Sequence, residues 1–295
     1  MWCLLPGGLV DDVGTIHDEV ELRALSGREE ELLAANSGAD SASLVTAVLS
    51  RCVQRIGGIS VVDAEIVRRL LVADRQFILL KLREETFGDQ VQGSVPCPWP
   101  DCGKRVAVSF STRDVPIEAS EDKGPFYSLT LSPEAMPGAD EAERAVTFRL
   151  PNGGDQEALS PLLAENDAAA LTGLFAHCLV RVGLNGGPDD ECVLGLSPLA
   201  RREIERHMDS VAPHVNLLME ATCAECGREF SAPFDLQRFF FGELRITSDL
   251  LYREVHYLAY HYHWSEREIM EMPRDRRHRY IDVLAEEIER LNESI

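Results

Sequence analysis

The fold is decided by two short motifs, Cys97-Pro98-Trp99-Pro100-Asp101-Cys102-Gly103 and Cys223-Ala224-Glu225-Cys226-Gly227. In each motif two cysteines flank a tight turn, which places two sulfur atoms on one side of a metal ion, and four thiolates suit tetrahedral zinc. The glycine that follows each pair permits the left-handed backbone that such a turn needs. The sequence therefore predicts one zinc ion bound by Cys97, Cys102, Cys223 and Cys226.

Two other states of these cysteines stay open, which are free thiols and a disulfide within each pair. The chain has 295 residues, 8 cysteines and 45% hydrophobic residues, whereas disulfide scaffolds are short and secreted. The first residues carry no basic segment, and their apolar run ends at Pro6, unlike a secretory signal. Reduced, metal-binding cysteines are the favoured interpretation. Because cysteine fills all four positions and leaves none open, the expected role of the zinc is structural.

Each cysteine turn lies between segments rich in β-forming residues, as a zinc ribbon requires. The first hairpin is marked by Val91, Val95, Val106, Val108 and Phe110. We expect a split zinc ribbon over residues 93–113 and 215–240, with an α/β insertion, residues 114–214, between its halves. Such a long insertion is acceptable because the entropic cost of closing a loop grows only logarithmically with its length.

The other segments are mainly helical, so the predicted fold class is α+β. Residues 1–40 are interpreted as an N-terminal arm, 41–92 as a helical part and 244–295 as a C-terminal helical domain, a helical hairpin. Ser265 and Glu268 are spaced as a capping box. Apolar spacing, caps and breakers predict a strand over 146–150 and helices over 41–55, 63–87, 155–165, 167–182 and 197–210.

The charge of the chain excludes some partners. Lys and Arg total 29 against 50 Asp and Glu, a formal net charge of −21. Phosphate backbones and anionic lipid surfaces attract basic proteins, so we expect no nucleic acid and no membrane as partner. No window approaches about 18 consecutive apolar residues, the length that spans a membrane. The expected location is the cytoplasm, or a larger particle that incorporates the protein.

No motif in the chain points to catalysis. We find no Gly-x-Ser-x-Gly elbow, no His-Glu-x-x-His pair and no phosphate-binding loop. We therefore predict no enzyme, no catalytic residues and no small-molecule substrate. The His- and Tyr-rich segment 256–264 is interpreted as a packing or partner-binding helix end, and the arginines between 274 and 279 as a solvated or salt-bridged face. For Phe239–Phe241, core and partner-binding edge remain equal alternatives.

Residues from Val20 to Glu243 resemble the T-even-phage-like baseplate hub assembly proteins encoded in phage-tail-like gene clusters. The resemblance is carried by both cysteine motifs and by the landmarks 21–30, 79–83, 87–89 and 148–157. It implies an assembly factor or hub component that is not an enzyme. In the first motif four residues separate the cysteines, where the family usually has a shorter turn.

The segment Leu251–Trp264, continuing to Tyr280, is similar to a small helical protein of extracellular contractile injection systems, fused here at the C-terminus. Together the two resemblances imply a non-enzymatic assembly factor or baseplate component of a phage tail-like contractile injection system. Its partners would be baseplate, hub or tail proteins. The alternative is a zinc-ribbon nucleic-acid-binding or regulatory protein, which needs a basic face near the cysteine turns. A zinc enzyme would need a fourth ligand other than cysteine.

Overall fold

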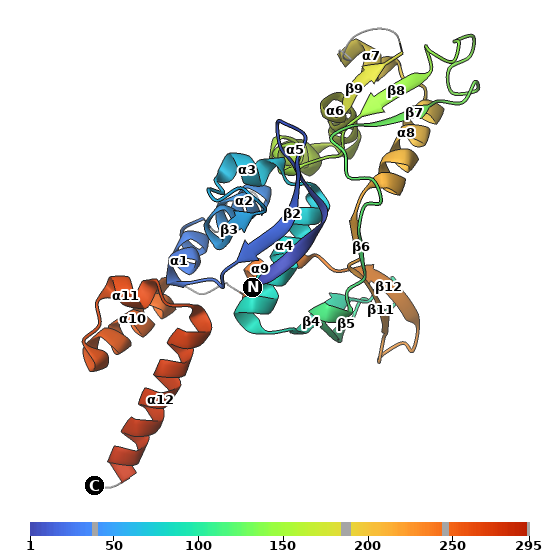
Figure 1. The fold of residues 1–295 in the computed structure, drawn as a ribbon. Coiled ribbons are helices and arrows are strands. Elements are labelled where there is room, and N and C mark those ends of the chain that lie inside the picture. Colours follow the sequence, from blue (N-terminus) through green and yellow to red (C-terminus); the bar gives the residue numbers. More distant parts are fainter. Residues whose placement is uncertain (37–40, 184–189, 244–247, 294–295) are drawn as a thin grey trace.

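The computed structural model describes residues 1–36, 41–183, 190–243 and 248–293. Its elements combine helices and strands in an α+β arrangement (Figure 1). A central body connects to the core of the insertion at one end and to the C-terminal helices at the other, while two β-hairpins extend from its side. Within the described residues, no helix combines the length and the apolar character that crossing a membrane requires.

The body is a three-stranded antiparallel sheet packed against helices. The sheet has the order β1-β2-β3, formed by β1 (Trp2–Val10), β2 (Ile16–Leu22) and β3 (Val53–Ile56). Its buried side chains share one hydrophobic core with side chains of α2, α4 and α9, including Val48, Ile78 and Phe240. The helices of the body are α1 (Gly27–Ala35), α2 (Ser41–Cys52), α3 (Ala64–Arg69), α4 (Val72–Phe87) and α9 (Leu236–Glu243).

Residues 1–36, most of the segment interpreted as an N-terminal arm, form β1, β2 and α1, and Leu5, Val20 and Leu22 are fully buried in the core of the body. The alternation of polar and apolar residues after His17 is the local signal of β2. The strand β1 carries a run of buried residues from Leu5 to Leu9 and pairs with β2 on either side of a register shift between Leu4 and Leu9. Within that break the Gly7 amide donates to Asp74 and the Pro6 carbonyl accepts from the Ser120 amide, so other elements complete its backbone hydrogen bonds.

Three predicted helices are shorter than expected because part of each forms extended backbone. The predicted helix 63–87 is broken at Leu70 and Leu71, where Leu71 forms a β-bridge with Asn152 and the Gly153 amide donates to the Leu70 carbonyl at 3.0 Å. The helix from Ser41 ends at Cys52, since the next residues form β3. The helix α6 (Asp167–Cys178) ends where β9 (Leu179–Val182) begins, and β-branched residues favour that change.

The insertion has a hydrophobic core of its own. The sheet β7-β8-β9 consists of β7 (Tyr127–Thr130), β8 (Ala145–Phe148) and β9, and Phe148 is fully buried against the insertion helices. The helices are α5 (Gly153–Glu165), α6, α7 (Asp190–Gly195) and α8 (Pro198–Val211). Ser197 caps α8 as predicted, accepting a hydrogen bond from the Ala200 amide. The insertion is joined to the ribbon hairpins by η1 (Thr112–Asp114) and by the pair β6 (Ile117–Glu118) and β10 (His214–Val215).

The C-terminal residues form three helices, not a two-helix hairpin. They are α10 (Ser248–Tyr262), α11 (Glu266–Met270) and α12 (Arg274–Glu293). The predicted capping box of Ser265 and Glu268 is confirmed, and it begins α11. Leu251, Leu258 and Ile269 belong to a separate hydrophobic cluster between these helices. The last turns of α12 project away from the rest of the molecule (Figure 1).

Candidate metal centre

The structure brings together the four cysteines of the two sequence motifs. Their sulfur atoms lie within 4.8 Å of one another. The Sγ–Sγ distance is 3.8 Å between Cys97 and Cys226 and 3.7 Å between Cys102 and Cys223. Four sulfurs at about 2.3 Å from a tetrahedral zinc lie about 3.8 Å from one another. The separations therefore fit a tetrahedral metal ion of this size.

Two separate hairpins supply the four sulfurs. The first is β4 (Gln90–Pro96) with β5 (Arg105–Ser111), and the second is β11 (Leu218–Thr222) with β12 (Glu229–Pro233). Each hairpin is a two-stranded sheet of its own. Side chains from both, among them Val95, Val106 and Phe230, bury Cys97 and Cys223 in a small shared cluster. So small a cluster contributes little hydrophobic stabilisation. A bound metal, coordinated by both hairpins, would stabilise their association.

The two cysteine turns have equivalent backbone geometry. The Cys97 amide donates to the Lys104 carbonyl at 2.8 Å, and the Cys223 amide donates to the Arg228 carbonyl at 3.0 Å. In each turn the glycine after the second cysteine has a positive φ, +59° at Gly103 and +69° at Gly227. That conformation strains any residue with a Cβ. The first turn has two more residues between its cysteines than the second. The hydrogen bond and the glycine conformation that flank the cysteines are nevertheless the same in both turns.

The surroundings of the sulfurs favour thiolate at one end of the cluster. Backbone amides of Cys226 and Glu225 lower the pKa of the Cys223 thiol to about 7. Burial raises the pKa of Cys97 to about 12, so its thiolate form needs a nearby cation. A divalent metal supplies that charge and deprotonates its ligands. Four sulfur donors this close together are compatible with a thiophilic metal.

A surface ion pair joins the two turns outside the sulfur cluster. The guanidinium of Arg228 donates to both carboxylate oxygens of Asp101, at 3.1 Å for one of them. The same guanidinium lies 5.0 Å from the ring centroid of Trp99. This pairing of Arg228 with Asp101 was not predicted from the sequence. The motif contained the signal, since Asp101 directly precedes Cys102 in the first turn.

The other cysteines with described side chains lie away from this cluster. Cys3 is partly buried, and Cys52 and Cys178 are fully buried. Burial raises the pKa of Cys3 to about 11 and those of Cys52 and Cys178 to about 12. Reactive cysteines have lowered pKa values, so these three are packing residues.

A buried cluster near Asp155 resembles a catalytic group but has a structural explanation. Arg149 donates to the two carboxylate oxygens of Asp155 at 2.6 and 2.8 Å. Asp155 also accepts from the Asn152 amide and lies 3.2 Å from His177 Nδ1. Burial alone would raise the pKa of Asp155, but these partners, Arg149 foremost, hold it below its usual range. The cluster fixes the turn between β8 and α5, one of the sequence landmarks.

The aromatic segments separate into core and surface residues. Phe240 is fully buried, with its ring centroid 6.3 Å from that of Phe87, while Phe239 and Phe241 are partly buried against the same core. The sequence had left core and edge open for this triplet, and the structure places it in the core. In the segment 256–264, Tyr262 and Trp264 stack at 4.7 Å inside the C-terminal helices, whereas Tyr260 is 69% exposed.

Comparison with protein families adds to this geometry. Residues 11–241 match the family described as T4 bacteriophage base plate protein. The chain belongs to this base plate family. Both cysteine turns and the whole insertion lie inside the matched range of the base plate family. The sequence resemblance implied a phage baseplate protein, and the family match agrees with that broad expectation.

A second family covers the rest of the chain. Residues 245–295 match a family of unknown function (DUF6760). The boundary between the two matches falls between α9 and α10, so the base plate family part ends where the C-terminal helices begin. No curated protein and no solved structure gave a significant match.

Proposed function

We propose that this chain is a non-enzymatic component or assembly factor of a base plate, in a phage tail-like contractile injection system. The match of residues 11–241 to the base plate family carries the proposal. Base plates consist of proteins held together by many contacts, so its partners would be other baseplate, hub or tail proteins. It would be made in the cytoplasm and act there or within the particle.

We further propose that Cys97, Cys102, Cys223 and Cys226 hold a structural zinc ion. Four sulfurs within 4.8 Å of one another, with separations of 3.8 Å for Cys97–Cys226 and 3.7 Å for Cys102–Cys223, support it. Because four thiolates complete a tetrahedron, the ion would have no open position for substrate or water. Its role would be to hold the two hairpins together where the insertion leaves the body and returns to it.

Nucleic-acid binding is the second candidate, and the surroundings of the turns count against it. It would need free cationic side chains near the hairpins. Arg228 is paired with Asp101, and Arg105 donates to the Ser94 hydroxyl at 2.7 and 2.9 Å. The net charge of −21 repels phosphate. Tight, salt-sensitive binding of DNA or RNA by the purified protein would revive this candidate.

Deletion in the producing cell tests the base plate role. Cells without this chain should yield few particles, or particles without complete base plates, when counted and imaged by electron microscopy. Mass spectrometry of purified wild-type particles then separates a resident component from a factor that leaves. Unchanged particle number and structure after deletion would refute the proposal.

Metal analysis of the purified protein tests the zinc site independently. We expect one zinc per chain and an X-ray absorption spectrum with four sulfur ligands. The variant Cys226→Ser should lose most of the metal, whereas Cys3→Ser, at a cysteine outside the cluster, should keep it. Equal metal content in the two variants would contradict the assignment.

A further inference from the structure

The two family-matched parts of the chain meet at the start of α1. In the base plate family part, the polar contacts come from Leu25 to Glu31, and Phe87 of α4 adds a ring contact with Arg274. On the other side lie α10, α11 and the first turn of α12. We call the three helices together the C-terminal module (residues 248–293). The Arg274 amide donates to the Leu25 carbonyl at 3.0 Å, and the Tyr252 hydroxyl donates to Glu31 at 2.6 Å. Contacts therefore surround the first turns of α1.

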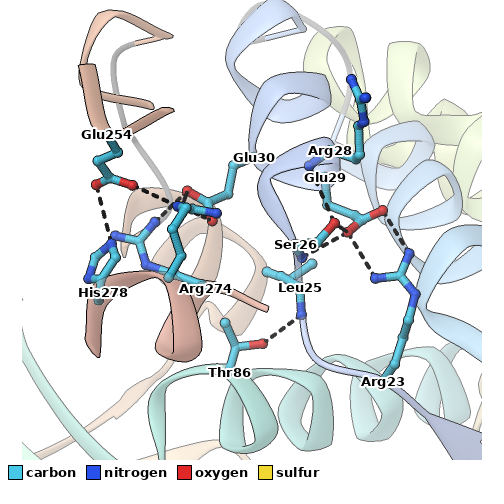
Figure 2. Close-up of polar contacts among 11 residues, drawn as sticks. Arg23, Leu25, Ser26, Arg28, Glu29, Glu30, Thr86, Glu254, Arg274 and His278 are labelled. Atoms are coloured by element: carbon cyan, nitrogen blue, oxygen red, sulfur yellow. Dashed lines mark hydrogen bonds and ion pairs between the residues drawn. The ribbon is translucent and has the colours of Figure 1, made fainter. Parts of the chain in front are cut away.

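A fully buried ion pair lies at the centre of this interface (Figure 2). Arg277 Nη2 donates to both carboxylate oxygens of Glu30 at 2.8 and 2.9 Å, and neither side chain is exposed to solvent. Arg274 adds a contact of 2.6 Å to Glu30. Behind it, Arg277 Nε donates to Glu254 at 2.8 Å, and His278 lies 3.3 Å from the same carboxylate. Two carboxylates thus balance the fully buried guanidinium of Arg277 and the partly buried guanidinium of Arg274.

Glu29 and Glu30 are adjacent in the sequence, but their carboxylates pair with different parts of the chain. Glu29 pairs with Arg23 at 2.8 and 3.0 Å and closes the capping box with Ser26, so it serves the body alone. Glu30 points to the C-terminal module, as Figure 2 shows. Buried carboxylates are seldom kept without a partner because their desolvation is costly. Without the C-terminal module, Glu30 would lose both of its arginine partners.

Gly27 shows that the two surfaces fit closely. A Cβ at Gly27 would lie 2.9 Å from Met270 Sδ and 3.2 Å from Arg277 Nη1. An alanine there would require Met270 or Arg277 of the C-terminal module to shift. Among the described residues, by contrast, the body and the C-terminal module each have a hydrophobic cluster of their own. A polar, closely fitted junction between two separate cores is typical of an interface between partners rather than of one continuous core.

From these observations we propose that the start of α1 is a docking site for the C-terminal module, and that the two associate without a covalent link. The partner that this surface fits is a helical module that carries the arginine pair Arg274 and Arg277. The buried guanidinium of this pair is that of Arg277, four positions after Pro273. The family of unknown function would thereby be a binding partner of the base plate family, joined here in one chain. The proposal does not depend on the metal.

Cutting the folded chain tests the docking directly. A protease recognition sequence inserted within residues 244–247 allows the intact, purified protein to be cleaved after folding. The two fragments should elute together in size-exclusion chromatography at micromolar concentration. A fluorophore on the shorter fragment then gives the dissociation constant, and unlabelled shorter fragment should displace the labelled one.

Matched variants of the cleavable chain show which contacts carry the association. Arg277→Gln should weaken binding by at least about 30-fold, because an unpaired buried charge remains. Gly27→Ala should also weaken it, without any change of charge. Arg279→Gln is the control, since its side chain is 81% exposed and does not contact Glu30. Circular dichroism of the uncut variants shows that each is folded.

The outcomes are distinct. If wild-type fragments separate on cleavage while both stay helical, the interface depends on the covalent link and the proposal fails. It also fails if Arg277→Gln and Arg279→Gln bind alike. Co-elution of the wild type, with loss in Arg277→Gln and Gly27→Ala only, supports it. None of these results changes with the outcome of the deletion experiment on the base plate role.

Discussion

Glu30 and Arg277 are 247 positions apart in the sequence, yet they form an ion pair in which both side chains are completely buried. Such a pair gains little over a hydrophobic contact of equal size, because both charges lose their hydration. Its geometry nevertheless defines one orientation of the C-terminal module on α1. The pair thus contributes specificity more than stability.

Removal of one member of this pair should destabilise the protein strongly. In Glu30→Gln the buried guanidinium of Arg277 keeps Glu254 but loses the carboxylate to which Nη2 donates, which should cost about 3–5 kcal/mol. Glu271→Gln provides the control, since it breaks the exposed pair with Arg267 and should cost at most about 1 kcal/mol. Urea unfolding followed by circular dichroism measures both. Equal midpoints for the two variants would contradict the buried pair.

If the proposed metal is bound, its removal should loosen the two cysteine hairpins before the body. A chelator of zinc should lower the melting temperature by roughly 10 °C, because binding of an ion to the folded state alone stabilises it. Limited proteolysis should then cut near residues 97–102 and 223–228 first. The double variant Cys97→Ser/Cys226→Ser, without a site, should show no response to the chelator. A wild type equally insensitive to the chelator would show that no metal holds the hairpins.

Two neighbouring glycines should respond differently to alanine. A Cβ at Gly153 would lie 2.2 Å from Nη1 of the buried Arg75, whereas at Gly154 the nearest atom is Asn152 Oδ1 at 3.2 Å. Gly153→Ala should therefore cost about 1–3 kcal/mol through overpacking. Gly154→Ala, in the same first turn of α5, should leave stability within about 1 kcal/mol because alanine favours the helix. Thermal unfolding of both variants decides, and a reversed order would contradict this packing.

Asp74 should make the protein more stable at mildly acidic pH. Its carboxylate is fully buried and accepts a hydrogen bond from the Gly7 amide at 2.8 Å. Burial raises its pKa from 3.8 to about 6, despite that amide and Lys123. Between pH 4 and 6 the folded state therefore binds more protons than the unfolded state, so this contribution to stability falls as pH rises through 6.

The variant Asp74→Asn isolates that contribution. It keeps an acceptor for Gly7 but has no charge to bury. The difference in unfolding free energy between wild type and variant should change by about 3 kcal/mol across the window, at 1.36 kcal/mol for each pKa unit. Other carboxylates, such as Asp155, titrate in both proteins and cancel. Parallel stability curves for the two proteins would rule out a raised pKa at Asp74.

Local chemistry in the sequence was sufficient for the cysteine turns and the helix caps. The spacing of the cysteines and the glycines after them predicted one cluster, and the structure places the four sulfurs together. Ser197 and Ser265 begin helices as predicted, because a cap depends on residues three positions away. The broad fold class followed from the same local patterns.

Long-range contacts account for what the sequence did not show. The break at Leu71 arises from its bridge to Asn152, and nothing near Leu71 signals it. The burial of β1 depends on pairing with β2 and packing on α4, so residues 1–40 were interpreted as an arm. Arg277 belonged to a predicted salt-bridged face, but the choice of Glu30 among many acids needed the folded chain.

The separation of the two cysteine turns also has a consequence for the order of events during synthesis. Cys102 leaves the ribosome 121 residues before Cys223. At about 5–20 residues per second, the first hairpin waits roughly 6–24 s for its second pair of ligands. The proposed zinc site can be completed only after the whole insertion has been translated. A filled site would thus mark a chain whose insertion is already complete, before the residues that dock on α1 have emerged.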